Sequence, residues 1–175
     1  ADGAAMLLWL QRNAPCPMDE RDVLKLAACV GADVPFFIKN EPCLALGIGE
    51  KLLPMPSGVE GWSCVIVCPH IHVDTAWAYA AWDEQHVAFS LTEWEKIAKD
   101  VPLRCSCLFG RNDFEEVVFA RWPKLSVWKA SLLEAGAEIA GMSGSGSALF
   151  GLFRDASLAV AAAEALRGRD AVIFG

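Results

Sequence analysis

The sequence has no long apolar run and no cluster of basic residues, and each absence narrows what the protein can do. Its longest apolar stretch covers only residues 3–10, which is too short to cross a bilayer. No basic segment, apolar core and cleavage site follow one another at the N-terminus, so no secretory signal is visible. The net charge is −7, and no group of Lys and Arg is concentrated enough to release counterions from a polyanion. We therefore expect neither a membrane nor a nucleic acid as partner, although loops and helix ends of an acidic protein can still bind a small anion.

The sequence also lacks a disulfide or metal-binding pattern. Its seven cysteines are odd in number, form no CxxC motif and mostly lie within apolar runs, as small core residues do in a reducing compartment. His70 and His72 could chelate a metal from one face of a strand, but the histidines and cysteines complete no ligand set. The composition thus predicts a cytosolic protein without a metal site.

What the sequence does contain is a high share of apolar residues, 54% of 175, against 21% charged residues. This length and composition can form one substantial core, or one domain and part of another. Pro54, Pro56 and Gly58 mark a boundary between two domains, which we expect to cover residues 1–58 and 59–175. No internal repeat or low-complexity tract is present.

Apolar spacing and turn signals predict an α+β fold, with an antiparallel sheet and helices on one face in the second domain. The first helix is apolar almost all round, which predicts that it is buried on nearly all sides. Helices are expected over residues 1–13, 19–30, 75–82 and 123–136, with others opening at 92–95, at 112–115 and after Asp155. Strands are expected over residues 36–38, 43–46, 62–68, 139–142, 148–153 and 171–174, with 36–38 paired to 43–46.

One acidic residue, Asp33, lies where a helix is expected to end and a buried strand to begin, in the segment GADVPFF of residues 31–37. Gly31 is placed to close the helix in the left-handed conformation, and Pro35 favours an extended Val34. A carboxylate held at such a junction is placed for chemistry. A lone Asp more often caps or turns the chain, so the residues alone do not establish the chemical role.

The segment SGSGS of residues 143–147 joins two expected strands. Alternating Ser and Gly let the backbone approach a ligand closely and offer N–H groups and hydroxyls to a phosphate. The segment is not a Walker loop, because it has no Lys-Ser/Thr ending and opens no helix. A flexible hairpin loop has the same composition, and this alternative stays open.

Two further pairs of residues have the spacing of a helix. Thr75 and Tyr79 are four residues apart, so a hydroxyl and an aromatic ring share one helix face and could hold a planar ligand. The alternative is that Tyr79 is an ordinary core aromatic. Asn112 and Glu115 could be catalytic, but their spacing is that of a capping box, and we interpret them as structural.

Four segments together resemble the 4-diphosphocytidyl-2-C-methyl-D-erythritol kinase family of the GHMP small-molecule kinases. They are residues 31–37, 47–52 (GIGEKL), 75–79 (TAWAY) and 142–147 (MSGSGS). The resemblance extends from residue 1 to 175, and GADVPF followed by GxGE is specific to this family, whereas the Ser/Gly segment indicates only the superfamily. The resemblance implies the GHMP kinase fold, with the end of the N-terminal domain in 1–58 and the C-terminal domain in 59–175.

The resemblance also implies a reaction and a set of residue roles. The reaction is transfer of the γ-phosphate of ATP to the 2-hydroxyl of 4-diphosphocytidyl-2-C-methyl-D-erythritol in the non-mevalonate isoprenoid pathway, with Mg²⁺ carried on the nucleotide. Asp33 matches the family's catalytic aspartate, which accepts the proton of the attacking hydroxyl or orients it. Tyr79 matches an aromatic residue that stacks on the cytosine ring, and Thr75 a polar contact beside it. The compartment would be the bacterial cytoplasm or the plastid stroma.

Phosphate contacts are implied for two segments. Ala1 and Asp2 begin the helix that follows the family's ATP loop, and they stand where Ser and Asn are usual. The Gly-rich loop that closes the site near the phosphates corresponds to Gly144, Ser145, Gly146 and Ser147. The ATP loop itself, an upstream Lys and half of the cytidine pocket have no counterpart here, so we expect this chain to require the N-terminal part of the same enzyme and to be inactive alone. Two alternatives remain: another GHMP kinase, of the mevalonate-pathway or homoserine type, and a non-catalytic binding domain with this fold.

Overall fold

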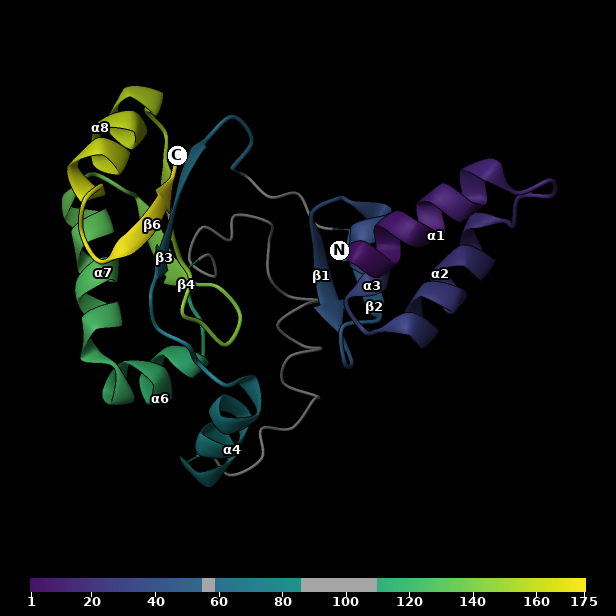
Figure 1. The fold of residues 1–175 in the computed structure, drawn as a ribbon, viewed down its shortest axis with the longest axis horizontal. Coiled ribbons are helices and arrows are strands. Elements are labelled where there is room, and N and C mark those ends of the chain that lie inside the picture. The colour runs from purple at the N-terminus through teal and green to yellow at the C-terminus, as the bar shows by residue number, and fades with distance from the viewer. Residues whose placement is uncertain (55–58, 86–109) are drawn as a thin grey trace. The chain divides into compact units, whose positions relative to one another are not determined.

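The computed structural model describes residues 1–54, 59–85 and 110–175. It divides the chain into two compact units, Ala1–Ser57 and Gly58–Gly175, which are described separately below (Figure 1). The helix expected to open at residues 92–95 lies outside the described residues.

Unit 1 consists of three helices and a β-hairpin. Its elements are α1 (Asp2–Asn13), α2 (Glu20–Val30), α3 (Val34–Lys39), β1 (Cys43–Leu46) and β2 (Lys51–Pro54). Helix α3 packs against both α1 and α2. Asp19 caps α2, as its position before the helix predicts, because its carboxylate accepts the N–H of Asp22 at 2.9 Å.

The prediction of a strand at residues 36–38 is wrong, because these residues form the middle of helix α3. Pro35 lies in the first turn of this helix, where its missing N–H costs no intrahelical hydrogen bond and its fixed φ suits the helix. Val34 is accordingly helical and not extended. Gly31 ends α2 with an extended φ of 173°, not in the expected left-handed conformation. Strand β1 therefore pairs antiparallel with β2, Leu46 opposite Lys51, and not with residues 36–38.

The expectation that α1 is buried on nearly all sides is also wrong for the described residues. Only Ala4 of this helix is buried, while Met6 and Trp9 are each 60% exposed. The reason is that, among the described elements, α1 packs mainly against α2 and α3, whereas its apolar residues run round the whole helix.

Unit 2 is an antiparallel sheet covered by helices on one face, as predicted. Its elements are β3 (Ser63–Pro69), α4 (Thr75–Gln85), α6 (Phe114–Arg121), α7 (Pro123–Glu134), β4 (Ile139–Met142), β5 (Leu149–Phe153), α8 (Ala156–Leu166) and β6 (Ala171–Phe174). The strand order is β4-β5-β3-β6, and α7 and α8 lie along the same side of the sheet (Figure 1). Val65 of β3 lies opposite Gly151 of β5, and Met142 of β4 opposite Leu149. No helix in the described parts of the chain is long and apolar enough to cross a membrane.

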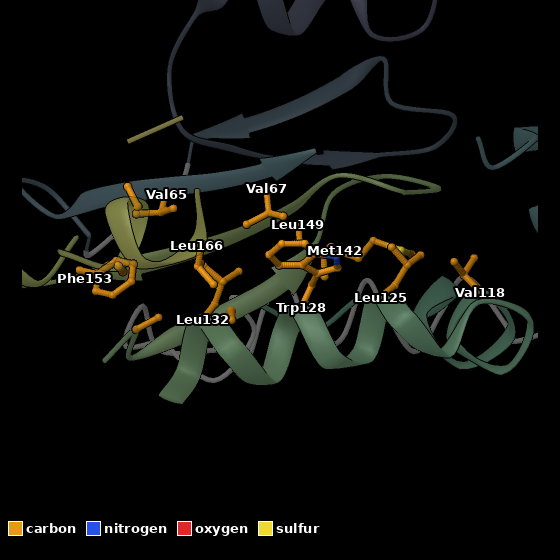
Figure 2. Packing of buried hydrophobic residues seen from close by; sticks show 14 of the residues in the cluster. Val65, Val67, Val118, Leu125, Trp128, Leu132, Met142, Leu149, Phe153 and Leu166 are labelled. Carbon is orange, nitrogen blue, oxygen red and sulfur yellow. The ribbon is translucent and has the colours of Figure 1, made fainter. Parts of the chain in front are cut away.

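The core of unit 2 lies between the sheet and the helices that cover it, chiefly α7 and α8. Figure 2 shows the apolar side chains of the strands meeting those of α7 across this layer. Among the described residues, Phe153, Leu125 and Leu132 are the largest side chains that are fully buried. This layer fixes the ends of β4 and β5, and therefore the segment between them, residues 143–147.

Candidate functional site

Asp33 carries a carboxylate that has no partner among the residues that the structure describes. It occupies the N-cap position of α3, but its side chain makes no capping hydrogen bond. The side chain is exposed, and no other described residue hydrogen-bonds or ion-pairs with it. The capping role that the sequence left open is therefore not what this side chain does, which leaves the carboxylate available for chemistry.

The turn between β1 and β2 lies against Asp33. A Cβ at Gly49, whose φ is +112°, would lie 3.3 Å from Asp33 Oδ1, so the turn comes close to the carboxylate. Glu50 holds this turn together, because its Oε2 accepts the N–H of Ile48 at 2.8 Å. Hydrogen bonds from the backbone of Glu50 itself and of Ile48 keep the pKa of Glu50 below its usual value. The GxGE segment thus forms one wall beside Asp33.

The first turn of α1 lies beside the first turn of α3. A Cβ at Gly3 would lie 3.1 Å from Val30 Cγ1 and 3.6 Å from Val34 Cγ2, so α1 meets the end of α2 and the start of α3 without an intervening side chain. Ala1 and Asp2, which precede Gly3, are therefore near the helix start that carries Asp33. Free N–H groups and the positive end of the helix dipole at the start of α1 can attract an anion.

In unit 2, the Ser/Gly loop, residues 143–147, is a tight connection held by its side chains. Its ends are closed by the N–H of Ser143, which donates to Ala148 O at 2.8 Å. The hydroxyls of Ser145 and Thr75 lie 2.9 Å apart, and Ser147 Oγ donates to Ile71 O at 2.6 Å. The structure therefore joins Thr75 to the loop, two positions that the sequence separates by 70 residues.

The same loop leaves backbone donors unused. Within residues 59–85 and 110–175, the N–H groups of Gly144, Ser145 and Ser147 have no acceptor. The N–H of Gly146, by contrast, donates to Ser143 O at 3.0 Å and closes the turn. Three free N–H groups in one short loop are suited to an oxyanion.

Tyr79 is not a core residue, although the sequence allowed it to be one. Its side chain is 56% exposed, and its ring packs edge-to-face on Phe114 with the ring centroids 4.8 Å apart. It lies one helical turn from Thr75, which touches the Ser/Gly loop. An aromatic ring held at one edge and open elsewhere can stack on a planar ligand.

The prediction of a capping box at residues 112–115 is wrong, because the bond that should run from the Glu115 side chain to the start of the helix is not made. Helix α6 starts at Phe114, whose N–H donates to Asn112 Oδ1 at 2.9 Å, but Glu115 does not reach back to close the box. Glu115 Oε1 accepts the N–H of Met142 at 2.9 Å, and its other oxygen pairs with Lys129 Nζ at 2.6 Å. Local spacing cannot distinguish the two arrangements, because the partners come from β4 and α7.

The segment before α6 reaches β4 through a contact between two glycines. A Cβ on Gly141 would lie 2.7 Å from Gly110 Cα and 2.8 Å from Gly110 O, and both atoms belong to backbone that cannot rotate away. We expect Gly141→Ala to destabilise unit 2 by about 1–3 kcal/mol, the range typical of overpacking. Thermal unfolding measures this, with Gly31→Ala as control, since a Cβ there meets only Val34 Cγ2 at 3.4 Å. Equal stability of the Gly141 variant and wild type would contradict the close approach.

The described residues offer no metal site of their own. They contain no group of three or more His, Cys, Asp or Glu side chains that could hold a metal ion, and His70 and His72 belong to no such group.

Comparison with known proteins shows which proteins this chain resembles. Residues 98–171 match the family model of the GHMP kinases C terminal domain. The chain is 42% identical over 170 residues to a 4-diphosphocytidyl-2-C-methyl-D-erythritol kinase of Lawsonia intracellularis, covering 89% of this chain and 55% of the relative. It is 43% identical over 178 residues to the kinase of the same name from Solidesulfovibrio magneticus, covering 96% and 59%. The chain is therefore similar to GHMP kinases over most of its own length.

Solved structures of GHMP kinases agree with this fold. A crystal structure of 4-(cytidine 5'-diphospho)-2C-methyl-D-erythritol kinase matches with a TM-score of 0.72 and 32% identity, over 99% of this chain and 62% of that one. Homoserine kinase from Cytophaga hutchinsonii matches with a TM-score of 0.64 at 17% identity, which shows a shared fold alone. The chain spans between 55% and 62% of the length of the relatives named here.

Proposed function

We propose that this chain forms the C-terminal part of an ATP-dependent kinase that phosphorylates the 2-hydroxyl of 4-diphosphocytidyl-2-C-methyl-D-erythritol in the non-mevalonate isoprenoid pathway. The observation that carries the proposal is the carboxylate of Asp33, which has no partner within residues 1–54, 59–85 and 110–175 and lies at a helix start beside the GxGE turn. The names and similarity of the relatives support the choice of substrate.

In unit 1, Asp33 accepts the proton of the substrate hydroxyl or orients that hydroxyl toward the γ-phosphate. Phosphoryl transfer requires positioning and charge stabilisation more than covalent chemistry, and one acceptor for this proton suffices. The start of α1, with Ala1 and Asp2, faces the triphosphate, where free N–H groups and the helix dipole favour negative charge.

In unit 2, the Ser/Gly loop receives phosphate oxygens and α4 receives the cytosine ring. The free N–H groups of Gly144, Ser145 and Ser147 supply the donors, and Gly146 allows the turn between them. Tyr79 stacks on the base, and Thr75, already bound to Ser145, lies between base and loop.

Mg²⁺ would be carried on the phosphates of ATP. The described residues hold no cluster that could bind the ion by themselves, which fits a metal that the nucleotide brings. When bound, the ion neutralises the charge of the phosphates.

This function assigns residues 1–58 to the end of the GHMP N-terminal domain and 59–175 to the C-terminal domain, with the N-terminal part of the same enzyme as partner. We place the enzyme in the bacterial cytoplasm, since the relatives named above come from bacteria.

A hybrid kinase tests the proposal. It joins residues 1–175 to the N-terminal remainder of the Solidesulfovibrio magneticus relative, which this chain matches over 59% of its length. With ATP and Mg²⁺, we expect the hybrid to phosphorylate 4-diphosphocytidyl-2-C-methyl-D-erythritol. A cooperatively folded hybrid that lacks this activity would contradict the proposal.

Tyr79→Ala tests the cytidine contact. We expect the variant hybrid to lose roughly 1–3 kcal/mol of affinity for the cytidylyl substrate, or about 5- to 150-fold, because base–aromatic stacking contributes this much. Isothermal calorimetry measures the loss. Tyr79→Phe is the matched control, since it keeps the ring and its contact with Phe114. Unchanged affinity in the Ala variant would favour a substrate without a nucleobase, as in another GHMP kinase.

A further inference from the structure

Asn112 binds the Ser/Gly loop through its carboxamide. Its Nδ2 donates to Met142 O at 2.8 Å and to Gly144 O at 2.7 Å, which uses both protons of the amide. Its Oδ1 accepts the N–H of Phe114 at 2.9 Å, and this bond fixes which way the amide faces. The side chain therefore connects the start of α6 to the last residue of β4 and to the loop itself.

Asn112 is held in place by a second contact between the same elements. Glu115, three residues along, accepts the N–H of Met142 at 2.9 Å and pairs with Lys129. The side chains of Glu115 and Lys129 are only 16% and 24% exposed, and Lys129 Nζ also donates to Gly110 O at 3.2 Å. The backbone on either side of Asn112 is thus tied to β4 and α7, so its amide meets the loop in a fixed position.

These bonds decide which polar groups the loop presents. A carbonyl oxygen repels a phosphate oxygen, whereas a backbone N–H attracts it. Asn112 binds the carbonyl groups of Met142 and Gly144 and keeps them toward the protein. The N–H groups of Gly144, Ser145 and Ser147 stay without a partner among the described residues.

We propose that Asn112 is a positioning residue of the phosphate site, which holds the Ser/Gly loop with its carbonyl groups turned to the protein and its free N–H groups available to phosphate oxygens. This inference rests on the proposed function, in which the loop binds the phosphates. Asn112 itself does not touch the ligand.

The test uses the ¹⁵N-labelled 175-residue chain and inorganic tripolyphosphate, followed by amide chemical shifts. In the wild type we expect saturable shifts at Gly144, Ser145 and Ser147. Asn112→Asp is isosteric but turns a carboxylate toward two carbonyl oxygens, and we expect it to raise the Kd for tripolyphosphate about tenfold or more. Asp113→Asn is the matched control, because Asp113 is adjacent, makes no capping bond and pairs with Arg111, so its Kd should stay within about twofold.

The outcomes separate the positioning role of Asn112 from the assignment of the loop as a phosphate site. If Asn112→Asp keeps the native shifts of β3 and α7 and binds tripolyphosphate within about twofold of the wild type, the positioning role is overturned. If the Asp variant does not fold, Asn112→Ala removes the same bonds without a charge, and a Kd raised about threefold or more supports the role. A smaller change in the folded Ala variant overturns it. If the wild-type loop does not respond to tripolyphosphate, the assignment of the loop as a phosphate site fails, and this inference fails with it.

Discussion

Replacing Asp33 by asparagine is expected to lower kcat of the hybrid kinase by about 10²–10⁴, the range typical of a general acid–base group. Asparagine keeps the size and removes the proton acceptor, so the attacking hydroxyl has no base. The KM values for ATP and for the cytidylyl substrate should change little, because the loss concerns the transition state more than ground-state binding. Steady-state kinetics measure both quantities.

Stability separates this catalytic effect from a structural one. The Asp33 side chain caps no helix and pairs with no described residue, so we expect the variant to unfold at the same temperature as the wild type. Asp22→Asn is the matched control in the same unit, since its partner is the exposed Lys25. Its kcat should stay within about twofold of the wild type. A fall in kcat of less than about tenfold for Asp33→Asn would show that Asp33 is not the acid–base group.

Phe153→Ala is expected to reduce the free energy of unfolding of unit 2 by about 3–5 kcal/mol. Phe153 is the largest fully buried side chain among the described residues, and it lies in the core of unit 2 (Figure 2). Its removal loses apolar burial and leaves a cavity that surrounding β5 and α7 can close only in part. Native-state hydrogen exchange of β3 and β5 amides measures the loss in unit 2 alone.

The matched control is Phe174→Ala in the same sheet. Phe174 is 56% exposed, so its truncation should change the unfolding free energy by about 0.5 kcal/mol or less. Equal effects at the two positions would contradict the described core.

Because β5 carries one end of the Ser/Gly loop, we also expect the Phe153 variant to weaken phosphate binding as it destabilises the sheet.

Elements with a local chemical signal could be predicted from the sequence. Asp155 accepts the N–H of Ser157 at 2.7 Å and caps α8, and Asp74 caps α4 by accepting the N–H of Trp77 at 2.7 Å. Such bonds join residues two or three positions apart, so the sequence records both partners. The apolar spacing of Leu125, Trp128 and Leu132 likewise places α7 against the sheet.

The errors arose where distant contacts decide the structure. The segment containing Pro35 has a pattern that allows both a strand and the first turn of a helix, and its packing in unit 1 selects the helix. Asn112 and Glu115 have the spacing of a capping box, but their partners lie about 30 residues away in β4. For Asp33, the residues alone favoured a cap or turn and left a catalytic role open. The structure excludes the capping role, because the Asp33 side chain makes no capping hydrogen bond. Only the contacts around the carboxylate could show this.

The most direct test of the account is the phosphate acceptor that the hybrid kinase uses. The assay offers 4-diphosphocytidyl-2-C-methyl-D-erythritol, homoserine and mevalonate in parallel, with ATP and Mg²⁺, and follows ADP formation and the phosphorylated product. We predict that only the cytidylyl substrate is phosphorylated and that Asp33→Asn abolishes nearly all of this activity. Phosphorylation of homoserine or mevalonate instead, or full activity of the Asp33 variant, would contradict this prediction.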